Sequence, residues 1–497
     1  MRHPGVASLG PSLRLLAERG HDIRLGYSTR RGESGRTLDE IVESVPNVTT
    51  VELPAPRRAP GWLELAEQFR RAGNYVRFLE PPYHNSPKLR RRAESYAPRL
   101  VRRLARVVRP AGRSGVLALH WVVERIERCL LPPEEIEAFL SEQRPDVLLV
   151  AHLLAFDGGE ADYLRAARKL GIRTAFPIRG WDNLTNKGLI RDAPDLVLAW
   201  NDLQAQEARE LHGVPKDRIR ITGAPKCDPL FAWQPRRARE DFCSTVGLRP
   251  DRPIVLYVGS SPFIAKREVG FVLRWIAGLR DHGGVLAEAG ILVRPHPLNG
   301  AQWTDAAIED PQVSIWPRGG EKPEDGPSRD NYFDSIHHAA AVVGINTTAQ
   351  IEGAVLGRPV HTLLAKEFRK TQEGTLHFRH LRAEEYGHVI VGRTLEEHAL
   401  QLEASLRGEF DRSRDERFLR RFVRPLGLDI VATNIVVDEI EALAARPAPA
   451  PRSGPLLAPI VRLALRPAVG RAARARVRRE RRRDEKQGRR HATGKRA

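Results

Sequence analysis

The chain has 497 residues, 41% hydrophobic and 29% charged, which is the composition of a globular protein with more than one core. Its three cysteines, Cys129, Cys227 and Cys243, form no CxxC or Cys/His pattern, which argues against a zinc site and a disulfide scaffold. No apolar run is long enough to cross a bilayer, and the first ten residues lack a signal peptide's apolar segment. We therefore expect two or three domains in a reduced, cytoplasmic compartment.

The net charge of +19 is concentrated at the C-terminus. Residues 448–497 contain 16 Lys and Arg against 3 Asp and Glu, whereas the rest of the chain contains 65 against 59. From about Ala445 the sequence is dominated by Ala, Pro and Arg, so we predict a disordered tail with a helical, basic segment. Such a tail suits the anionic inner face of the plasma membrane, although a solvated tail without function stays open. Nucleic acid also attracts basic tails, but it is not the partner we expect.

The first part of the chain begins and ends with helix. Pro11–Gly20 is predicted as an amphipathic helix, and Asp22–Tyr27 and Val48–Leu53 as strands. In a parallel sheet this helix should follow a strand, yet only Met1–His3 precede the glycine-containing loop. We hypothesise that the first strand is missing or truncated and that the true start codon lies upstream. A helical insertion is predicted at about residues 62–143, with helices at Trp62–Arg71, Ser86–Tyr96, Pro98–Arg109, Leu117–Leu130 and Pro133–Gln143.

The helices at residues 86–109 are amphipathic and strongly basic. Their apolar residues recur at helical spacing, and nine Lys and Arg cover the other sides. Such helices can lie on an anionic membrane, or they can be surface helices with a solvated arginine face. The sequence leaves both possibilities open.

From Pro145 onward, short apolar strands alternate with helices, which is typical of a doubly wound α/β fold. We predict strands at Asp146–Ala151, Arg173–Ile178, Asp195–Trp200, Arg218–Thr222, Pro253–Val258, Gly290–Arg294, Val313–Trp316, Ala339–Val343 and Val360–Leu364. The predicted fold is two doubly wound Rossmann-like domains that face each other across a cleft. The predicted boundaries are 1–222 for the first Rossmann-like domain, 223–240 for a linker, 241–394 for the second Rossmann-like domain, 395–447 for helices that cross back, and 448–497 for the tail; the resemblance described below makes the first the acceptor domain and the second the nucleotide-donor domain.

The segment Gly344–Val360, GINTTAQIEGAVLGRPV, has the pattern of strand end, tight turn, helix and strand. Asn346 or Thr347 is expected to cap the helix, with free backbone N–H groups beside it. A helix start with free donors and hydroxyls suits a phosphate, although simple capping is the commoner role. Glu352, one turn later, suits the hydroxyls of a ribose or sugar.

Other polar side chains also follow predicted strands, where ligands of this fold bind. The loop at residues 179–188 suits a sugar, which would stack on an indole and bind side-chain amides, or it is an Asx-turn with a packed indole. Its candidate substrate-binding residues are Trp181, Asp182, Asn183, Asn186 and Lys187. Arg294 and His296 suit a diphosphate clamp, and Ser260 and Ser261 offer hydroxyls to the same phosphates. In the last loop, Gln372 and Glu373 are candidates for donor-sugar hydroxyls or belong to an ordinary surface loop.

Two stretches, the Arg-Pro-His-Pro loop at residues 294–297 and Gly344–Val360, resemble the donor domains of GT-B glycosyltransferases. The likeness is to bacterial envelope-polysaccharide enzymes and CDP-glycerol glycerophosphotransferases. It implies that Thr347 and Thr348 meet the diphosphate of a nucleotide-sugar or CDP-polyol donor, that Glu352 binds the ribose, and that Gln372 or Glu373 contacts the transferred group.

The resemblance also implies that a histidine in the first loop of the acceptor domain is the catalytic base, a position that His3 occupies. His152 and Asp157, after the next strand, are substitutes. No Asp-x-Asp pair is present, so we expect no metal and no cofactor beyond the activated donor. The expected function is glycosyl transfer to an envelope glycan or lipid-linked acceptor. The rivals are a glycerophosphotransferase, a UDP-sugar 2-epimerase and a non-catalytic protein of the same fold.

Overall fold

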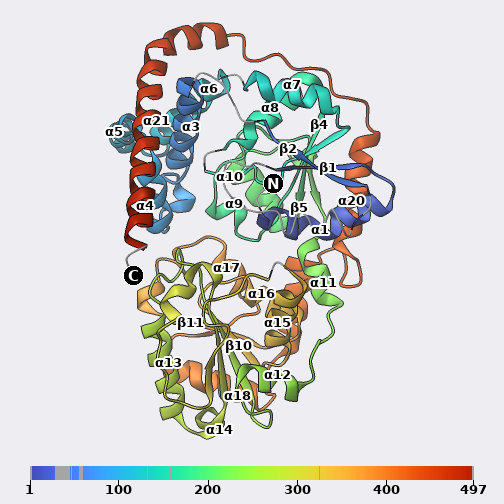
Figure 1. The fold of residues 1–497 in the computed structure, drawn as a ribbon, viewed down its shortest axis with the longest axis vertical. Helices are drawn as coiled ribbons and strands as arrows, with labels where there is room; N and C mark the ends of the chain where they lie inside the picture. The colour runs from blue at the N-terminus through green and yellow to red at the C-terminus, as the bar shows by residue number, and fades with distance from the viewer. Residues whose placement is uncertain are drawn as a thin grey trace.

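Each of two lobes is organised around one main parallel sheet in the described part of the chain (Figure 1). The computed structural model describes residues 3–27, 45, 47–54, 60–130, 132–156, 158–323 and 325–494. The upper lobe of Figure 1 is built from the N-terminal part of the chain and the lower lobe from the strands after residue 250. Helices cover both faces of each sheet, so the predicted fold class of two doubly wound α/β domains is confirmed.

The main sheet of the upper lobe has four parallel strands in the order β3-β4-β5-β6. These are β3 (Val147–Leu149), β4 (Arg173–Pro177), β5 (Leu196–Ala199) and β6 (Ile219–Ile221). Helix α7 (Glu134–Gln143) leads into β3, α8 (Glu160–Leu170) connects β3 to β4, and α10 (Asp202–His212) connects β5 to β6. A separate parallel pair, β1 (Ile23–Tyr27) and β2 (Val48–Glu52), lies at the predicted positions.

The first helix, α1 (His3–Glu18), begins earlier than predicted and includes His3. The prediction of a loop at residues 3–5 is therefore wrong. Pro4 is tolerated because the first turn of a helix needs no partner for its N–H groups. The buried residues Leu9, Leu13 and Leu16 form a stripe at helical spacing that packs the helix on the sheet. The hypothesis of a first strand upstream stays a prediction.

Before α7, four described helices form most of the insertion between β2 and β3: α3 (Pro60–Arg77), α4 (Pro87–Tyr96), α5 (Arg99–Val108) and α6 (Gly112–Arg128). They share one apolar cluster that includes Val76, Leu89, Val101 and Leu119. The predicted helical insertion is thus present, and Pro98 marks the break between α4 and α5 because it cannot continue a helix.

The lower lobe has six parallel strands in the order β12-β11-β10-β7-β8-β9. They are β7 (Ile254–Val258), β8 (Gly290–Arg294), β9 (Val313–Ile315), β10 (Ala341–Gly344), β11 (Val360–Leu363) and β12 (Ile390–Gly392). Helices α12 (Arg239–Val246), α15 (Gly326–His337) and α16 (Ala349–Val355) cover one face, and α13 (Val269–His282) and α18 (Leu395–Leu406) cover the other. The sequence analysis missed β12, which has only three residues and lies at the sheet edge.

After the lower lobe the chain returns to the upper one. Helix α19 (Arg412–Phe418) continues into a π-helical segment, Leu419–Val423, and α20 (Ala432–Ala445) then packs beside α1 and strands β3 and β4 (Figure 1). Its buried residues Val436, Val437, Ile440 and Leu443 complete a core under the upper sheet. Helix α20, although late in the sequence, is therefore part of the upper lobe.

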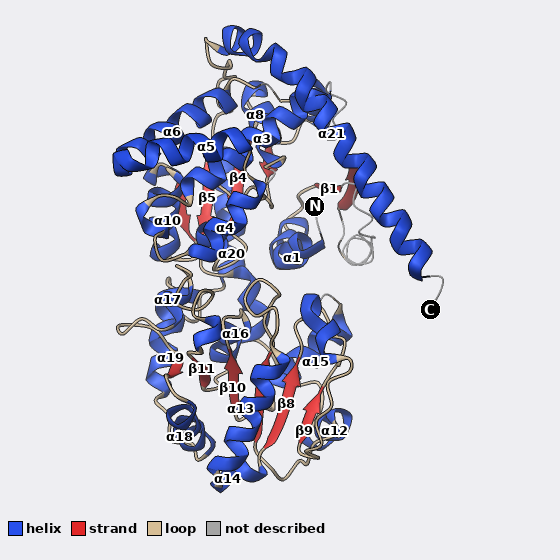
Figure 2. Ribbon diagram, turned by 90° about the vertical axis from the view of Figure 1, so that its left-hand side faces the viewer, coloured by secondary structure: helices blue, strands red, loops and turns tan. Residues whose placement is uncertain are grey.

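The predicted helical, basic segment of the tail is present, but it is longer than expected: residues 458–494 form the helix α21 (Ala458–Gly494) that packs along α3, so the expectation of a disordered tail is wrong for these residues (Figures 1 and 2). Alanine and arginine have high helix propensity, and small residues let the two helices approach closely. A Cβ on Gly61 of α3 would lie 2.2 Å from the carbonyl oxygen of Val469. Within the described residues, no helix has the length and apolar content that a membrane span requires.

Candidate functional site

Three strands of the lower sheet end side by side. Val258 of β7 is paired with Gly344 of β10 on one side and with Arg294 of β8 on the other. Neighbouring strands lie about 4.8 Å apart, so the loops that follow these three residues share one edge. This edge carries the segments that the sequence analysis singled out for phosphate binding.

The loop after β10 leads into α16 through Asn346, Thr347 and Thr348. The predicted cap by Asn346 or Thr347 is wrong: Thr348 precedes the helix and makes no side-chain cap, and the N–H of Thr347 donates to the Gln350 Oε1 at 3.1 Å. Within the described part of the chain, no acceptor lies on the N–H of Thr348 or Ala349. Two backbone donors at a helix start are thus available to an anion.

Glu352 projects one turn further along α16 and is held from two sides. The Tyr332 hydroxyl donates to its Oε2 at 2.6 Å, and the Lys226 ammonium lies 3.4 Å from its Oε1. Although burial alone would lower the pKa of Lys226, the Glu352 carboxylate raises it above the ordinary value. Lys226 belongs to the segment that joins the lobes, so this ion pair ties the α16 edge to the upper lobe.

The loop after β7 is rigidly held. The N–H of Ser260 donates to both carboxylate oxygens of Glu268, at 3.0 and 2.9 Å, and the Tyr257 hydroxyl donates to one of them at 2.9 Å. Burial raises the pKa of Glu268 to about 7, against the effect of these hydrogen bonds. The Ser260 side chain is fully buried, whereas the Ser261 side chain is half-buried.

In the Arg-Pro-His-Pro loop the two predicted clamp residues differ. The Arg294 guanidinium is buried, donates to Ser335 Oγ and Glu321 Oε2 at 3.1 Å each, and lies over the Trp316 and Tyr332 rings. It thereby holds α15 against β8. His296 is half-buried, and its Nδ1 accepts from the N–H of Leu298 at 3.0 Å. Burial lowers the pKa of His296, so the neutral ring carries its proton on Nε2.

Trp181, predicted to stack on a sugar, lies in the contact between the lobes. Its Nε1 donates to the Thr348 Oγ1 at 3.3 Å, and its ring meets the His377 ring edge to face, with centroids 4.8 Å apart. Trp181 is therefore packed against the start of α16. The indole links the upper loop to the hydroxyl that the resemblance assigns to the diphosphate.

The other polar residues of this loop bind one another. Asp182 accepts from Asn183 Nδ2 at 3.0 Å and from Asn186 Nδ2 at 3.2 Å, and Lys187 Nζ donates to Asn183 Oδ1 at 3.3 Å. Burial alone would raise the pKa of Asp182, but Lys187, His377 and the two amides lower it. These contacts match the Asx-type alternative, in which the loop's amides hold its own carboxylate.

His377, which the sequence analysis did not single out, joins the two lobes by hydrogen bonds. Asn346 Nδ2 donates to His377 Nε2 at 3.3 Å, and His377 Nδ1 lies 3.3 Å from the Thr185 Oγ1, which donates to the Asp182 carbonyl. Burial lowers the pKa of His377 to about 4, so the ring is neutral and its proton lies on Nδ1. Its position within the predicted last loop, residues 366–378, was the available signal.

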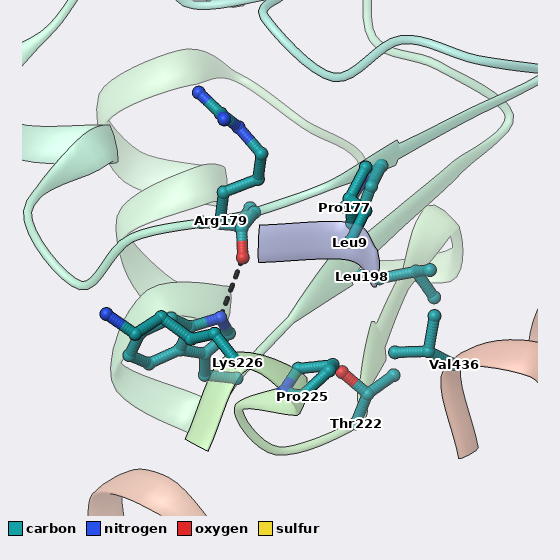
Figure 3. A pocket seen from close by; sticks show the side chains of 10 residues that line it. Leu9, Pro177, Arg179, Leu198, Thr222, Pro225, Lys226 and Val436 are labelled. Carbon is teal, nitrogen blue, oxygen red and sulfur yellow. Dashed lines mark hydrogen bonds between the residues drawn. The ribbon is translucent and has the colours of Figure 1, made fainter. Parts of the chain in front are cut away.

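A small pocket lies at the carboxyl ends of β4 and β5 (Figure 3). Its cavity volume is only about 10 Å³, and it is lined mainly by apolar side chains from α1, the two strands and α20. The Trp200 Nε1 donates to the Ile178 carbonyl at 2.7 Å. Its polar members are Arg179, Thr222 and Lys226, and Lys226 also pairs with Glu352. The pocket therefore lies next to the α16 edge.

The predicted catalytic bases are only partly described. His152 is half-buried in the turn after β3, where its carbonyl accepts from the N–H of Ala155 at 3.0 Å. His3 is the first residue of α1, with its side chain outside the described part, and Asp157 lies outside the described residues. Among the described residues, no three His, Cys, Asp or Glu side chains gather in a way that suits a metal ion.

Gln372, a candidate for donor-sugar contacts, is fully buried in the lower lobe. Its Nε2 donates to the carbonyls of Ile345 and Leu363, and its Oε1 accepts from the N–H of Ala365. The side chain thus fastens the loops after β10 and β11. Its neighbour Glu373 is exposed and pairs with Arg382 at 3.4 Å.

Gln372→Leu is expected to lower the free energy of unfolding by about 2–3 kcal/mol, because it leaves buried backbone groups without partners. Glu373→Gln, the matched control, removes only an exposed ion pair and should cost less than about 0.5 kcal/mol. Urea unfolding followed by tryptophan fluorescence measures both. Equal stability of the two variants would mean that Gln372 does not hold these loops.

No protein-family model matches the chain, and no curated protein matches it. Solved structures do match. A UDP-N-acetylglucosamine 2-epimerase candidate from Listeria monocytogenes is 11% identical, with a TM-score of 0.51 over 91% of this chain and 97% of the other. A glycosyltransferase from Rickettsia africae is 9% identical, with a TM-score of 0.50 over 89% and 95%. The UDP-GlcNAc 2-epimerase of Methanocaldococcus jannaschii is 13% identical, with a TM-score of 0.47 over 88% and 97%. At these identities the likeness to the first two structures shows the fold alone: two Rossmann-like domains in the GT-B arrangement.

Proposed function

We propose that the protein is a metal-independent glycosyltransferase that uses a nucleotide-diphosphate sugar and an envelope glycan or lipid-linked acceptor. The observation that carries the proposal is the pair of available N–H groups, on Thr348 and Ala349, at the start of α16. They lie at the carboxyl edge of the lower sheet, directly opposite Trp181 of the upper lobe. A diphosphate is the ligand that such donors favour, and neighbours named as a glycosyltransferase and a 2-epimerase candidate for UDP-N-acetylglucosamine support a nucleotide-linked sugar.

Each side chain of the α16 edge has a role in this proposal. Thr347 and the Nε2–H of His296 complete the diphosphate site, and Glu352 accepts from the ribose hydroxyls. Arg294 is a positioning residue, because its guanidinium holds α15, from which Tyr332 meets Glu352. The acceptor is proposed to approach the donor beside Arg179 and Lys226, at the carboxyl ends of the upper strands.

The proposed reaction is a direct displacement. A base in the upper lobe, His152 or its alternatives His3 and Asp157, takes the proton of an acceptor hydroxyl, and the oxygen attacks the anomeric carbon of the donor. The bond to the diphosphate breaks, and its electron pair leaves with the diphosphate. The α16 amides and His296 stabilise that developing charge. The proposed location is the cytoplasm, with the basic helix α21 directed to the inner face of the membrane.

Thr347→Asp tests the donor site. A carboxylate at a helix start favours the helix but occupies and repels the phosphate position, so the fold should persist while the dissociation constant rises at least about 100-fold. Thermal-shift assays with UDP-, GDP-, CDP- and dTDP-linked sugars measure this. In the unaltered protein the cognate donor at 100-fold excess over its dissociation constant should add about 2.7 kcal/mol of stability.

Thr347→Asn is the matched control and should retain the nucleotide-induced shift. Unchanged donor binding by Thr347→Asp would contradict the site, and failure of every nucleotide to stabilise the unaltered protein would favour a non-catalytic role. Mass analysis separates the remaining rivals: a transferase releases nucleotide diphosphate and lengthens the acceptor, whereas a 2-epimerase changes the donor alone. Release of a nucleoside monophosphate would identify a glycerophosphotransferase.

A further inference from the structure

Helices α5 and α6 form a hairpin, residues 99–128, within the insertion, and α6 packs on α3. The turn between them is tight: Gly112 has φ 63°, and a Cβ on Gly115 would lie 2.3 Å from the carbonyl oxygen of Val108. Glycine is required at such a close approach. The two helices therefore contact each other directly, and Figure 2 shows them on the left of the upper lobe.

The inner side of the hairpin is a normal apolar core. Val101 and Ala105 of α5 and Val116, Leu119 and Val123 of α6 are buried in the cluster that includes α3 and α4. This stripe is sufficient to hold the hairpin in place, since it recurs at helical spacing on both helices. Other apolar residues of the hairpin thus need a different explanation.

The outer sides of both helices carry a second set of apolar residues. Their exposed fractions lie between 42% and 74%, and they are Leu100, Leu104, Val107, Leu117, Trp121 and Val122. Single exposed apolar residues are normal, but six large ones on two adjoining helices indicate an interaction surface.

The charge around these residues is entirely positive over a long stretch. Ala97 to Val123 contain six arginines and no Asp or Glu. Five of these six arginines are exposed, namely Arg99, Arg103, Arg106, Arg109 and Arg113. A further arginine, Arg125, lies with its guanidinium carbon 5.3 Å from the centroid of the Trp121 ring. A partner must therefore offer both negative charge and an apolar layer.

We propose that the α5–α6 hairpin docks the protein on an anionic lipid bilayer. Phospholipid headgroups would pair with the arginines, while the leucines, valines and Trp121 would enter the boundary between headgroups and acyl chains. The proposal is separate from the donor site and from the basic tail. Helix α3 contacts both α6 and α21 and lies between them (Figure 2).

Flotation of the full-length protein with vesicles tests the proposal. The unaltered protein should bind vesicles of phosphatidylcholine mixed with phosphatidylglycerol and not vesicles of phosphatidylcholine alone. Val107→Ser combined with Trp121→Ser removes apolar surface without changing charge and should weaken binding at least about tenfold. Because both side chains are exposed, the melting temperature should not change.

Leu400→Ser combined with Leu426→Ser is the matched control, because these leucines are exposed to a comparable degree and belong neither to the hairpin nor to α21. This control should bind vesicles as the unaltered protein does. The proposal fails if the unaltered protein ignores anionic vesicles, or if the hairpin variant binds them undiminished. A dimer in solution that only the hairpin variant loses would assign the surface to a second copy of the chain instead.

Discussion

Glu127→Gln is expected to lower the free energy of unfolding by about 3–5 kcal/mol. The Glu127 carboxylate is fully buried among three arginines. Its oxygens lie 2.9 Å from Arg165 Nη2, 3.3 Å from Arg70 Nε and 3.5 Å from Arg191 Nη1. Asp162 and Asp192 balance the remaining positive charge through Arg70 and Arg165. Loss of the central carboxylate leaves one buried positive charge without a counter-ion, and this costs more than an exposed pair.

The same carboxylate makes stability depend on pH. Burial alone would raise the pKa of Glu127, but the three arginines lower it to about 2 from the ordinary 4.5. Because the folded-state pKa is depressed, the stabilisation is fully present above pH 4.5 and is lost as the pH falls from 4.5 to about 2. The difference between the unaltered protein and Glu127→Gln should therefore shrink on acidification.

Glu124→Gln is the control for this prediction, since Glu124 lies one turn earlier on α6. Its pair with Arg128, at 2.6 Å, is partly exposed, and its loss should cost less than about 0.5 kcal/mol. Chemical unfolding of the three proteins, followed by circular dichroism near neutral pH and near pH 3, measures both effects. Equal stability of the two variants would refute the assigned role of the arginine cluster.

Asp228→Asn is expected to lower the free energy of unfolding of the upper lobe by about 3–4 kcal/mol. Asp228 lies in the segment between the lobes, at the start of the short helix α11 (Asp228–Phe231). Its Oδ1 lies 2.6 Å from Arg424 NH2, and its Oδ2 accepts from the N–H and hydroxyl of Thr433 at 2.7 Å each. The carboxylate therefore caps α20 and neutralises a mostly buried guanidinium.

The effect of this variant should be localised. Without its cap, α20 should exchange its amide hydrogens faster and become cleavable by protease, since its apolar residues complete the core under β3 and β4. Asp438→Asn on the same helix is the control, because the Asp438 pair with Arg19 is exposed and contributes little. If hydrogen exchange in α20 is equal in the two variants, Asp228 does not anchor the helix.

Most strands could be predicted from the sequence because parallel strands buried on both faces are short apolar runs bounded by turn residues. The segment Gly344–Val360 shows both the strength and the limit of such patterns. Its strand, helix and strand lie where predicted, yet Gln350 and not Asn346 binds the N–H group near the helix start. Local spacing fixes the element, whereas side-chain partners depend on neighbours that are distant in sequence.

The predictions of a loop at residues 3–5 and of a disordered tail failed for a related reason. Glycine and proline near residue 5 suggested a loop, but burial of Leu9, Leu13 and Leu16 favours helix, because packing outweighs local propensity. The Ala- and Arg-rich tail has helix propensity but no apolar stripe of its own, so its order depends on the contact with α3. A composition signal cannot show such a contact.

By itself, the sequence determined the two alternating α/β halves, the helical insertion, the basic C-terminus and the strand ends at which polar residues gather. These features follow from periodicity and composition, which act over a few residues. Only the tertiary structure decided which polar residues face a ligand edge and which are structural. It buried Gln372 and Arg294, placed Trp181 on Thr348, and brought His377 between the lobes. Those roles depend on burial and hydrogen-bond partners supplied by another domain, which no local pattern encodes.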